Sequence, residues 1–202
     1  LFDVRQGGFL LNPLKKSRTI AELTGYDGDD IGEILALLWQ AYDAQKAAFM
    51  AAPKLETIAK AIDFPLIAIL ARMEFHGMKL DTKFLAAMNV ELTRDIEAVQ
   101  VAMYEMVGYE FNIASPAQLA QVLFTKLMLP TTGIKKGKTG YSTGQKELDK
   151  LRGQHPIIEL IEKYRELTKL QNTYVEALPK LVDPHSYIHT TFNQDVAATG
   201  RL

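Results

Sequence analysis

The sequence predicts a mainly α-helical protein, built on a long antiparallel pair of helices with a smaller helical tip between them. Three observations support this fold class. Apolar residues between positions 83 and 107 advance by three or four positions, as on one face of a helix. A second long stretch, residues 155–182, carries an apolar stripe of the same period. Between the two, Ser115 and Ser142 mark the starts of two short helices.

Helices are also predicted before the long pair. Residues 30–51 carry apolar side chains at helical spacing and follow the turn-rich stretch YDGDD. A further helix can begin after Pro53, and another apolar segment runs from Phe64 to a stop at Gly77. The N-terminal third is therefore expected to be helical as well.

Two short strands are expected beside these helices. The residues MKLD, 78–81, predict a strand that leads to a helix cap at Asp81. Residues 189–192 are β-branched, aromatic or histidine, which favours a second strand.

The long helices each have one apolar face. The first seam comprises Leu85, Met88, Leu92, Ile96, Val99, Met103 and Met106, and the second stripe Ile157, Leu160, Ile161, Tyr164 and Leu167. A near-heptad seam over about seven turns must pack on another long helix. We therefore expect these two helices to pair.

Composition limits the possible functions. The chain has 202 residues and 48% hydrophobic content, with no apolar run long enough to span a membrane and no secretory signal. The absence of cysteine excludes disulfides and thiolate metal sites and fits a reducing cytoplasm. The net charge is only -1, yet residues 130–152 carry six cationic and two anionic side chains. Any affinity for nucleic acid must come from this local excess.

The predicted tip combines two helix starts with a lysine-rich loop. Ser115 and Ser142 each precede a glutamine by three residues, the pattern of a capping box. The loop between them contains Lys135, Lys136 and Lys138. Helix N-termini and lysines bind phosphates readily. The alternative is that the serines only cap and the lysines are only solvated.

The second long helix carries polar donors beside its apolar stripe. Arg165, Lys169 and Asn172 have the spacing i, i+4 and i+7. They can project toward a bound phosphate backbone. Alternatively, Arg165 and Lys169 pair with Glu162 or Glu166 on an ordinary charged face.

Five stretches in order resemble the thumb and first palm strands of family A DNA polymerases, the bacterial DNA polymerase I family. They are DFPLIAILARMEFHGMKLD, YEFNIASPAQLAQVLFTKLMLP, KTGYSTGQKELDKL, HPIIELIEKYRELTKLQNTYVEALPKLVDP and IHTTFNQ…ATGRL. The N-terminal FDVRQGGFLLNP and the helices after it resemble the second half of that family's 3′-5′ exonuclease-like domain. The resemblance implies four parts: exonuclease-like residues 1–52, connecting helices and the first palm strand at 53–80, the thumb at 81–182 and the start of the palm at 183–202.

The resemblance implies a role for each matching residue. Asn112, Ser115, Ser142, Thr143, Arg165 and Lys169 match thumb positions on the DNA backbone, and Arg201 in ATGRL matches an arginine in the minor groove near the primer terminus. Asn172 stands where serine is usual, Ala114 where asparagine or serine is frequent, and residues 195–198 replace a threonine-rich run. These departures put the individual contacts there in doubt.

The resemblance also implies the partners of the parent protein. They are primer-template duplex DNA, with dNTP and Mg²⁺ used only by the intact polymerase. It implies a monomer in the bacterial cytoplasm, at the nucleoid, that acts in replication and repair. The family's metal-binding carboxylates follow the palm strands, so we expect the chain to end before them and to be inactive alone.

Other acidic residues do not form a catalytic set. Residues 27–30, DGDD, fit a turn with helix caps better than a calcium loop. Trp39 and Asp43 match the tyrosine and aspartate of the last exonuclease motif, but indole cannot orient a water as a phenol does. We expect a vestigial exonuclease-like part in which Asp43 is a surface residue.

An alternative hypothesis is a helical protein-interaction module, in which the apolar seam of residues 83–107 docks a partner helix. The two hypotheses differ in the expected salt dependence of binding. DNA binding through lysine and arginine weakens steeply with salt, whereas docking through an apolar seam does not.

Overall fold

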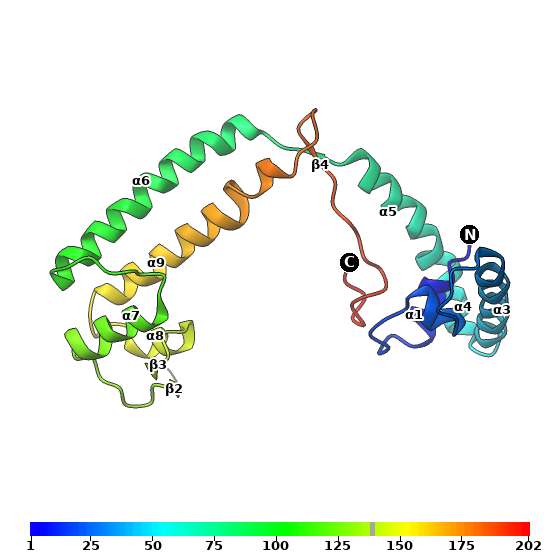
Figure 1. The fold of residues 1–202 in the computed structure, drawn as a ribbon, viewed down its shortest axis with the longest axis horizontal. Helices are drawn as coiled ribbons and strands as arrows, with labels where there is room; N and C mark the ends of the chain where they lie inside the picture. The colour runs from blue at the N-terminus through cyan, green and yellow to red at the C-terminus, as the bar shows by residue number, and fades with distance from the viewer. Residues whose placement is uncertain (138–139) are drawn as a thin grey trace. The chain divides into compact units, whose positions relative to one another are not determined.

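The computed structural model describes residues 1–137 and 140–202. The chain forms two compact units. Unit 1 comprises Leu1–Met78 and His189–Leu202, and unit 2 comprises Lys79–Ile188. Both units consist mainly of helices, with short strands only (Figure 1), so the predicted fold class is confirmed.

Unit 1 begins with five α-helices. They are α1 (Val4–Leu11), α2 (Ile20–Thr24), α3 (Ile31–Met50), α4 (Pro53–Ile58) and α5 (Phe64–His76), with the π-helical turn η1 (Ala59–Asp63) joining the last two. Local signals explain the boundaries. Asp30 caps α3 by accepting from the backbone N–H groups of Gly32 and Glu33, and Pro53 occupies the first turn of α4. Gly77 follows α5 with a φ of 65°, which ends the helix.

The small core of unit 1 is aromatic. Phe49, Ala59 and Phe64 are buried, and Phe2 packs against them, with its ring centroid 4.6 Å from that of Phe64. Aromatic rings bury much apolar area per residue. This cluster therefore ties the first residues of the chain to α3 and α5.

The C-terminal segment returns to unit 1 through polar contacts. The backbone N–H of Phe192 donates to the Glu74 carboxylate at 2.6 Å, and Gln194 donates to the carbonyl of Asp63 at 3.2 Å. The Arg5 guanidinium forms an ion pair of 2.5 Å with Asp195. These contacts hold residues 192–195 against the helices.

Strands β1 (Met78–Lys79) and β4 (Tyr187–Ile188) pair with each other. The strand at residue 78 is thus confirmed, whereas the strand predicted at residues 189–192 is wrong. The Nδ1 atom of His189 lies 2.7 Å from the carbonyl oxygen of Glu74, and the N–H of Phe192 also contacts Glu74. His189 and Phe192 therefore contact Glu74 near the end of α5 instead of pairing with a neighbouring strand.

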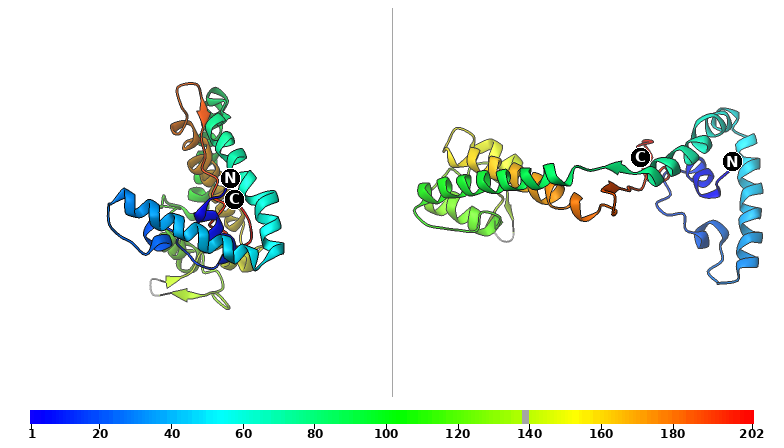
Figure 2. Two further views of the ribbon diagram at one scale, coloured as in Figure 1. Left: turned by 90° about the vertical axis from the view of Figure 1, so that its right-hand side faces the viewer. Right: turned by 90° about the horizontal axis from the view of Figure 1, so that it is seen from above.

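In unit 2, α6 (Thr82–Val107) and α9 (Ile157–Leu170) run side by side in opposite directions (Figures 1 and 2). Helix α9 continues through the π-helical turn η3 (Gln171–Val175) to a 3₁₀ turn, η4 (Leu178–Lys180). The predicted helix pair is confirmed.

Both long helices contribute buried residues to the core of unit 2. On α6 the buried residues are Leu92, Ile96, Val99, Met103 and Val107. Met106, which the near-heptad pattern placed in the seam, is 42% exposed. An α-helix has 3.6 rather than 3.5 residues per turn, so the buried face drifts by a residue over several turns. Val107 therefore replaces Met106 at the end of the helix.

The tip contains α7 (Pro116–Gln121), the π-helical turn η2 (Val122–Lys126), the strands β2 (Lys136–Gly137) and β3 (Gly140–Tyr141), and α8 (Gln145–Leu151). The two strands pair antiparallel, Lys136 opposite Tyr141 and Gly137 opposite Gly140. Figure 1 shows these elements gathered at one end of α6 and α9. Fully buried residues from the tip and from α9, such as Leu119, Leu148 and Ile161, join one core.

Candidate nucleic-acid interface

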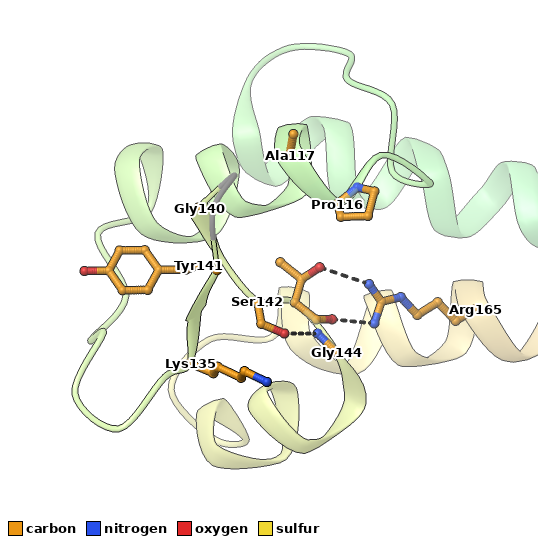
Figure 3. Close-up of a pocket in the computed structure, with 10 residues that line it drawn as sticks. Pro116, Ala117, Lys135, Gly140, Tyr141, Ser142, Gly144 and Arg165 are labelled. Atoms are coloured by element: carbon orange, nitrogen blue, oxygen red, sulfur yellow. Dashed lines mark hydrogen bonds between the residues drawn. The ribbon is translucent and has the colours of Figure 1, made fainter.

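An open cavity of about 420 Å³ lies in the tip of unit 2 (Figure 3). It is bounded by the start of α7, the β2–β3 hairpin, the turn before α8 and one residue of α9. Its lining residues are Pro116, Ala117, Lys135, Gly137, Gly140, Tyr141, Ser142, Thr143, Gly144 and Arg165. Four of the sequence-predicted site residues line the cavity: Lys135, Ser142, Thr143 and Arg165.

Arg165 on α9 provides the most constrained charge in the cavity. Its Nη1 atom donates to the Thr143 carbonyl at 2.7 Å, and Nη2 donates to the Thr143 hydroxyl at 3.4 Å (Figure 3). Partial burial lowers the pKa of the Arg165 guanidinium, because a less polar environment disfavours the cation. Arginine nevertheless stays charged at any working pH.

Arg165 takes part in none of the salt bridges found among the described residues, 1–137 and 140–202. Glu162 instead accepts hydrogen bonds from Arg152 at 3.0 Å and from Gln145 at 2.5 Å. The alternative that Arg165 pairs with Glu162 is therefore wrong. The cavity holds a cation whose hydrogen-bond partners in the described structure are neutral.

Ser142 does not cap α8, contrary to the sequence prediction. The N-cap is Gly144, and the Ser142 hydroxyl accepts from the Gly144 N–H at 3.2 Å. The expected capping box fails because the Gln145 side chain donates to Asp149 at 3.1 Å and to Glu162. Ser142 thus shapes the turn that faces the cavity rather than the helix start itself.

Thr143 is 4% exposed, and the Arg165 guanidinium holds both its carbonyl and its hydroxyl. At this exposure the Thr143 side chain has little surface for an external ligand. In this conformation Thr143 orients Arg165.

Ser115 caps α7, as predicted: its hydroxyl accepts from the Gln118 N–H at 3.5 Å. The Gln118 side chain, however, accepts from the Asn112 N–H at 2.8 Å instead of closing the capping box on Ser115. The Asn112 carboxamide oxygen in turn accepts from the Ala114 N–H at 3.0 Å. Asn112 and Ser115 therefore belong to one turn, which leads into the wall of the cavity at Pro116.

The predicted lysines differ in their surroundings. Lys135 is exposed and lines the cavity, while the ammonium of Lys136 lies 5.4 Å from the centre of the Tyr141 ring, a cation–π contact. Lys138 lies outside the described residues. Lys169 on α9 and Asn172 in η3 are exposed and do not line the cavity.

Arg201 belongs to unit 1, whereas the other predicted site residues belong to unit 2. It is exposed, and its Nε atom donates to the Thr199 hydroxyl at 3.2 Å. This contact links two residues of the ATGRL stretch.

Glu147 is not among the predicted site residues. This residue of α8 is 8% exposed and contacts the backbone of Lys135, which lines the cavity. Its spacing to Leu151 is i, i+4, so it shares a helical face with a fully buried residue. That spacing was the available signal for a buried carboxylate.

In residues 1–137 and 140–202, no group of three or more His, Cys, Asp or Glu could hold a metal ion. Asp30 is a helix cap, and Asp43 is exposed on α3, as predicted. Within the same residues, no helix combines the length and the apolarity needed to cross a membrane.

Comparisons with known proteins find relatives among DNA polymerases. DNA polymerase I of Geobacillus stearothermophilus is 53% identical over 142 residues, which are 70% of this chain and 16% of that protein. The thermostable DNA polymerase I of Thermus thermophilus is 40% identical over 176 residues, which are 86% of this chain and 21% of that protein. The chain thus spans only a small part of these curated relatives.

A solved structure matches nearly the whole chain. The POL domain of Pol1 from M. smegmatis, in complex with DNA primer-template and dNTP, superposes with a TM-score of 0.82 at 30% sequence identity. The match covers 99% of this chain and 36% of that one. Residues 82–202, more than half of the sequence, match the pattern of DNA polymerase family A, and the chain therefore belongs to that family.

Proposed function

We propose that unit 2 binds duplex primer-template DNA through the phosphate backbone, as the thumb of a DNA-directed DNA polymerase. In this proposal the chain is part of a longer polymerase that acts in replication and repair as a cytoplasmic monomer. Nucleotide transfer from dNTP, with Mg²⁺, takes place outside residues 1–202, and these residues alone neither extend a primer nor degrade a 3′ end.

The observation that carries the proposal is the cation in the tip cavity. Arg165 is partly buried and held by neutral groups, and the exposed Lys135 lines the same cavity. A desolvated guanidinium gains most from an anion that accepts in its plane, and phosphate is such an anion. Glycines at positions 137, 140 and 144 leave room for a close approach of a backbone.

The proposed contacts carry no sequence information. Lys135, Lys136, Arg165 and Lys169 are cations, while Ser115 and Asn112 offer hydroxyl and amide groups. Groups of these kinds position a protein on phosphates and sugars without reading base edges. A polymerase thumb must hold every sequence, so such a set suits it. We assign Asn172 and the Ser142 and Thr143 turn to the same surface, with Thr143 acting through Arg165.

Arg201 is proposed to act separately, in the minor groove near the primer terminus. Every base pair presents acceptors there, so one arginine can test pair geometry without specifying a base. The relative from M. smegmatis, solved with primer-template and dNTP, supports DNA as the partner.

The docking alternative is not favoured. The seam residues Val99 and Met103 are at most 5% exposed, because they are packed in one core with residues of α9 and the tip. A partner helix would have to displace α9.

Salt-dependent binding tests the proposal. Fluorescence anisotropy of a labelled primer-template duplex, titrated with the 202-residue chain over a series of salt concentrations, should give a steep fall of log affinity with log salt. Replacing Lys135 and Lys136 by alanine should weaken binding and flatten this slope by up to about 0.9 per lost contact.

The matched control replaces Lys15 and Lys16, an exposed adjacent pair in unit 1, and should leave the slope unchanged. A wild-type slope near zero, or equal slopes for both double variants, would contradict the proposal. Incubation of the chain with labelled primer-template, nucleotides and magnesium should give no extension.

A further inference from the structure

A buried carboxylate lies at the base of the lysine-bearing hairpin. Glu147 on α8 is 8% exposed, within a stretch of sequence that is otherwise rich in cations. Carboxylates are rarely buried unless they are paired and hydrogen-bonded. The partners of Glu147 therefore indicate what its burial achieves.

The carboxylate connects α8 to the chain just before β2. One oxygen, Oε2, accepts from the backbone N–H of Lys135 at 3.2 Å and from the ammonium of Lys150 at 2.7 Å. The same ammonium donates to the carbonyl of Gly133 at 2.7 Å. Glu147 and Lys150 thus hold the backbone on both sides of Ile134.

We call the contacts of Glu147 and Lys150 with the backbone of Gly133 and Lys135 the anchor, and the residue between these two is fixed as well. Ile134 is 8% exposed and belongs to the core of unit 2, and Gly133 has a φ of 76°. That left-handed conformation favours glycine and turns the chain toward α8. Beyond the anchor, the carbonyl of Lys135 accepts from the Ser142 N–H at 2.8 Å, which joins the hairpin base to the turn that faces the cavity.

We propose that Glu147 is a positioning residue for DNA binding: by tethering the hairpin base to α8, it directs Lys135 and Lys136 toward the phosphate backbone. This inference rests on the proposed function of unit 2. Phosphate binding by Lys135 and Lys136 would then depend on an acidic residue, Glu147, which is itself buried. The hydrogen bond from the ammonium of Lys150 is the first cause of the lowered pKa of Glu147, so this contact favours the ionised carboxylate.

The tether and the charge of Glu147 predict opposite effects of its removal. If the residue acted only through its charge, removing it would make the tip more positive, and DNA would bind more tightly. If it acts as a tether, its removal frees the hairpin, fewer lysine contacts form, and DNA binds more weakly despite the more positive charge. The sign of the change therefore separates the two effects.

Asp149 provides a matched control. It lies on the same helix and carries the same charge, but it is exposed and interacts with Gln145 and Arg152 instead of the hairpin. The experiment compares Glu147→Ala with Asp149→Ala in the full 202-residue chain. It measures duplex affinity by fluorescence anisotropy and the slope of log affinity against log salt.

We expect Glu147→Ala to weaken binding and to flatten the slope by about 0.9 to 1.8, the loss of one or two phosphate contacts. Asp149→Ala should bind as wild type or more tightly. In a chain that already lacks the Lys135 and Lys136 side chains, Glu147→Ala should change the slope no further. Equal or tighter binding by Glu147→Ala would overturn the inference.

A second variant and a readout without DNA cover the case in which Glu147→Ala does not fold. Glu147→Gln keeps an acceptor for the Lys135 N–H but loses the ionic contact with Lys150, so its slope should lie between wild type and the lysine double variant. Hydrogen exchange of the Lys135 amide in the free chain should be faster in Glu147→Gln than in Asp149→Asn, and equal exchange in the two would count against the tether. If the wild-type chain shows no salt-dependent binding, the proposed function fails, whereas the exchange measurement still tests the anchor.

Discussion

Replacement of Arg165 by methionine tests how far the cation in the cavity also stabilises the tip. Methionine keeps a long apolar stem on α9 but removes the guanidinium that binds Thr143. The change therefore isolates the two hydrogen bonds from the packing of the stem. Lys169→Met, one turn later on the helix, removes the same charge from an exposed position without a described contact to Thr143.

The size of the effect follows from the geometry. A hydrogen bond with a charged partner contributes about 1.5 to 3 kcal/mol, and the bond of 2.7 Å from Arg165 to the Thr143 carbonyl is of this kind. The second bond, at 3.4 Å, exceeds the usual range and adds little. Because Arg165 is only partly buried, we take the lower value, about 1.5 kcal/mol. For a unit of about 100 residues this corresponds to a fall in melting temperature of roughly 6 to 12 °C.

Thermal melting of the 202-residue chain, followed by circular dichroism, measures the change. Arg165→Met should lower the transition of unit 2 by the stated amount, while Lys169→Met should shift it little, because exposed substitutions usually change stability by no more than about 0.5 kcal/mol. The reasoning is refuted if Arg165→Met melts like wild type or if the two variants lose equal stability. Either result would mean that the contacts with Thr143 do not hold the turn to α9.

Three further outcomes are expected. Ile161→Ala should lower the free energy of unfolding of unit 2 by about 2 to 5 kcal/mol in urea titrations, since the Ile161 side chain is 0% exposed, and a loss below about 1 kcal/mol would contradict the packing. Because its contacts lower the pKa of Glu147 from the ordinary 4.5, the carboxylate stabilises the fold above that pH, and this contribution is lost as the pH falls through the lowered value. The difference in melting temperature between wild type and Glu147→Gln should therefore shrink as the pH falls below 4.5, and a constant difference would exclude the ionic contact. In a polymerase that includes the palm, Arg201→Ala should raise the activation free energy of single-turnover incorporation by about 2 to 4 kcal/mol. It should weaken the free energy of duplex binding by less than about 1 kcal/mol. A loss confined to duplex affinity would disprove the role of Arg201 at the primer end.

The helices could be predicted because their signals are local. Asp30, Pro53 and Gly77 mark boundaries through their own backbone preferences, and Ser115 caps the helix that follows it. Ser142 shows the limit of such signals. The same spacing of serine and glutamine gives a turn there: Gly144 is the N-cap of α8, and the Ser142 hydroxyl accepts from the Gly144 N–H.

The candidate site was predictable as a set of residue types but not as an arrangement. The bond between Arg165 and Thr143 joins residues 22 positions apart, and no sequence period encodes it. The burial of Glu147 could not be predicted, because a glutamate in a charged helix is usually solvated. Only the packing of the hairpin against α8 explains its burial.

The division of the chain into units has a consequence for folding. Unit 2 is inserted between the two segments of unit 1, and Arg5 pairs with Asp195, 190 positions later. During synthesis the first segment therefore emerges long before the residues that complete its contacts. Unit 2, whose contacts lie within one continuous stretch, can fold in the meantime, and the closing of unit 1 around such distant partners is expected to be the slow step.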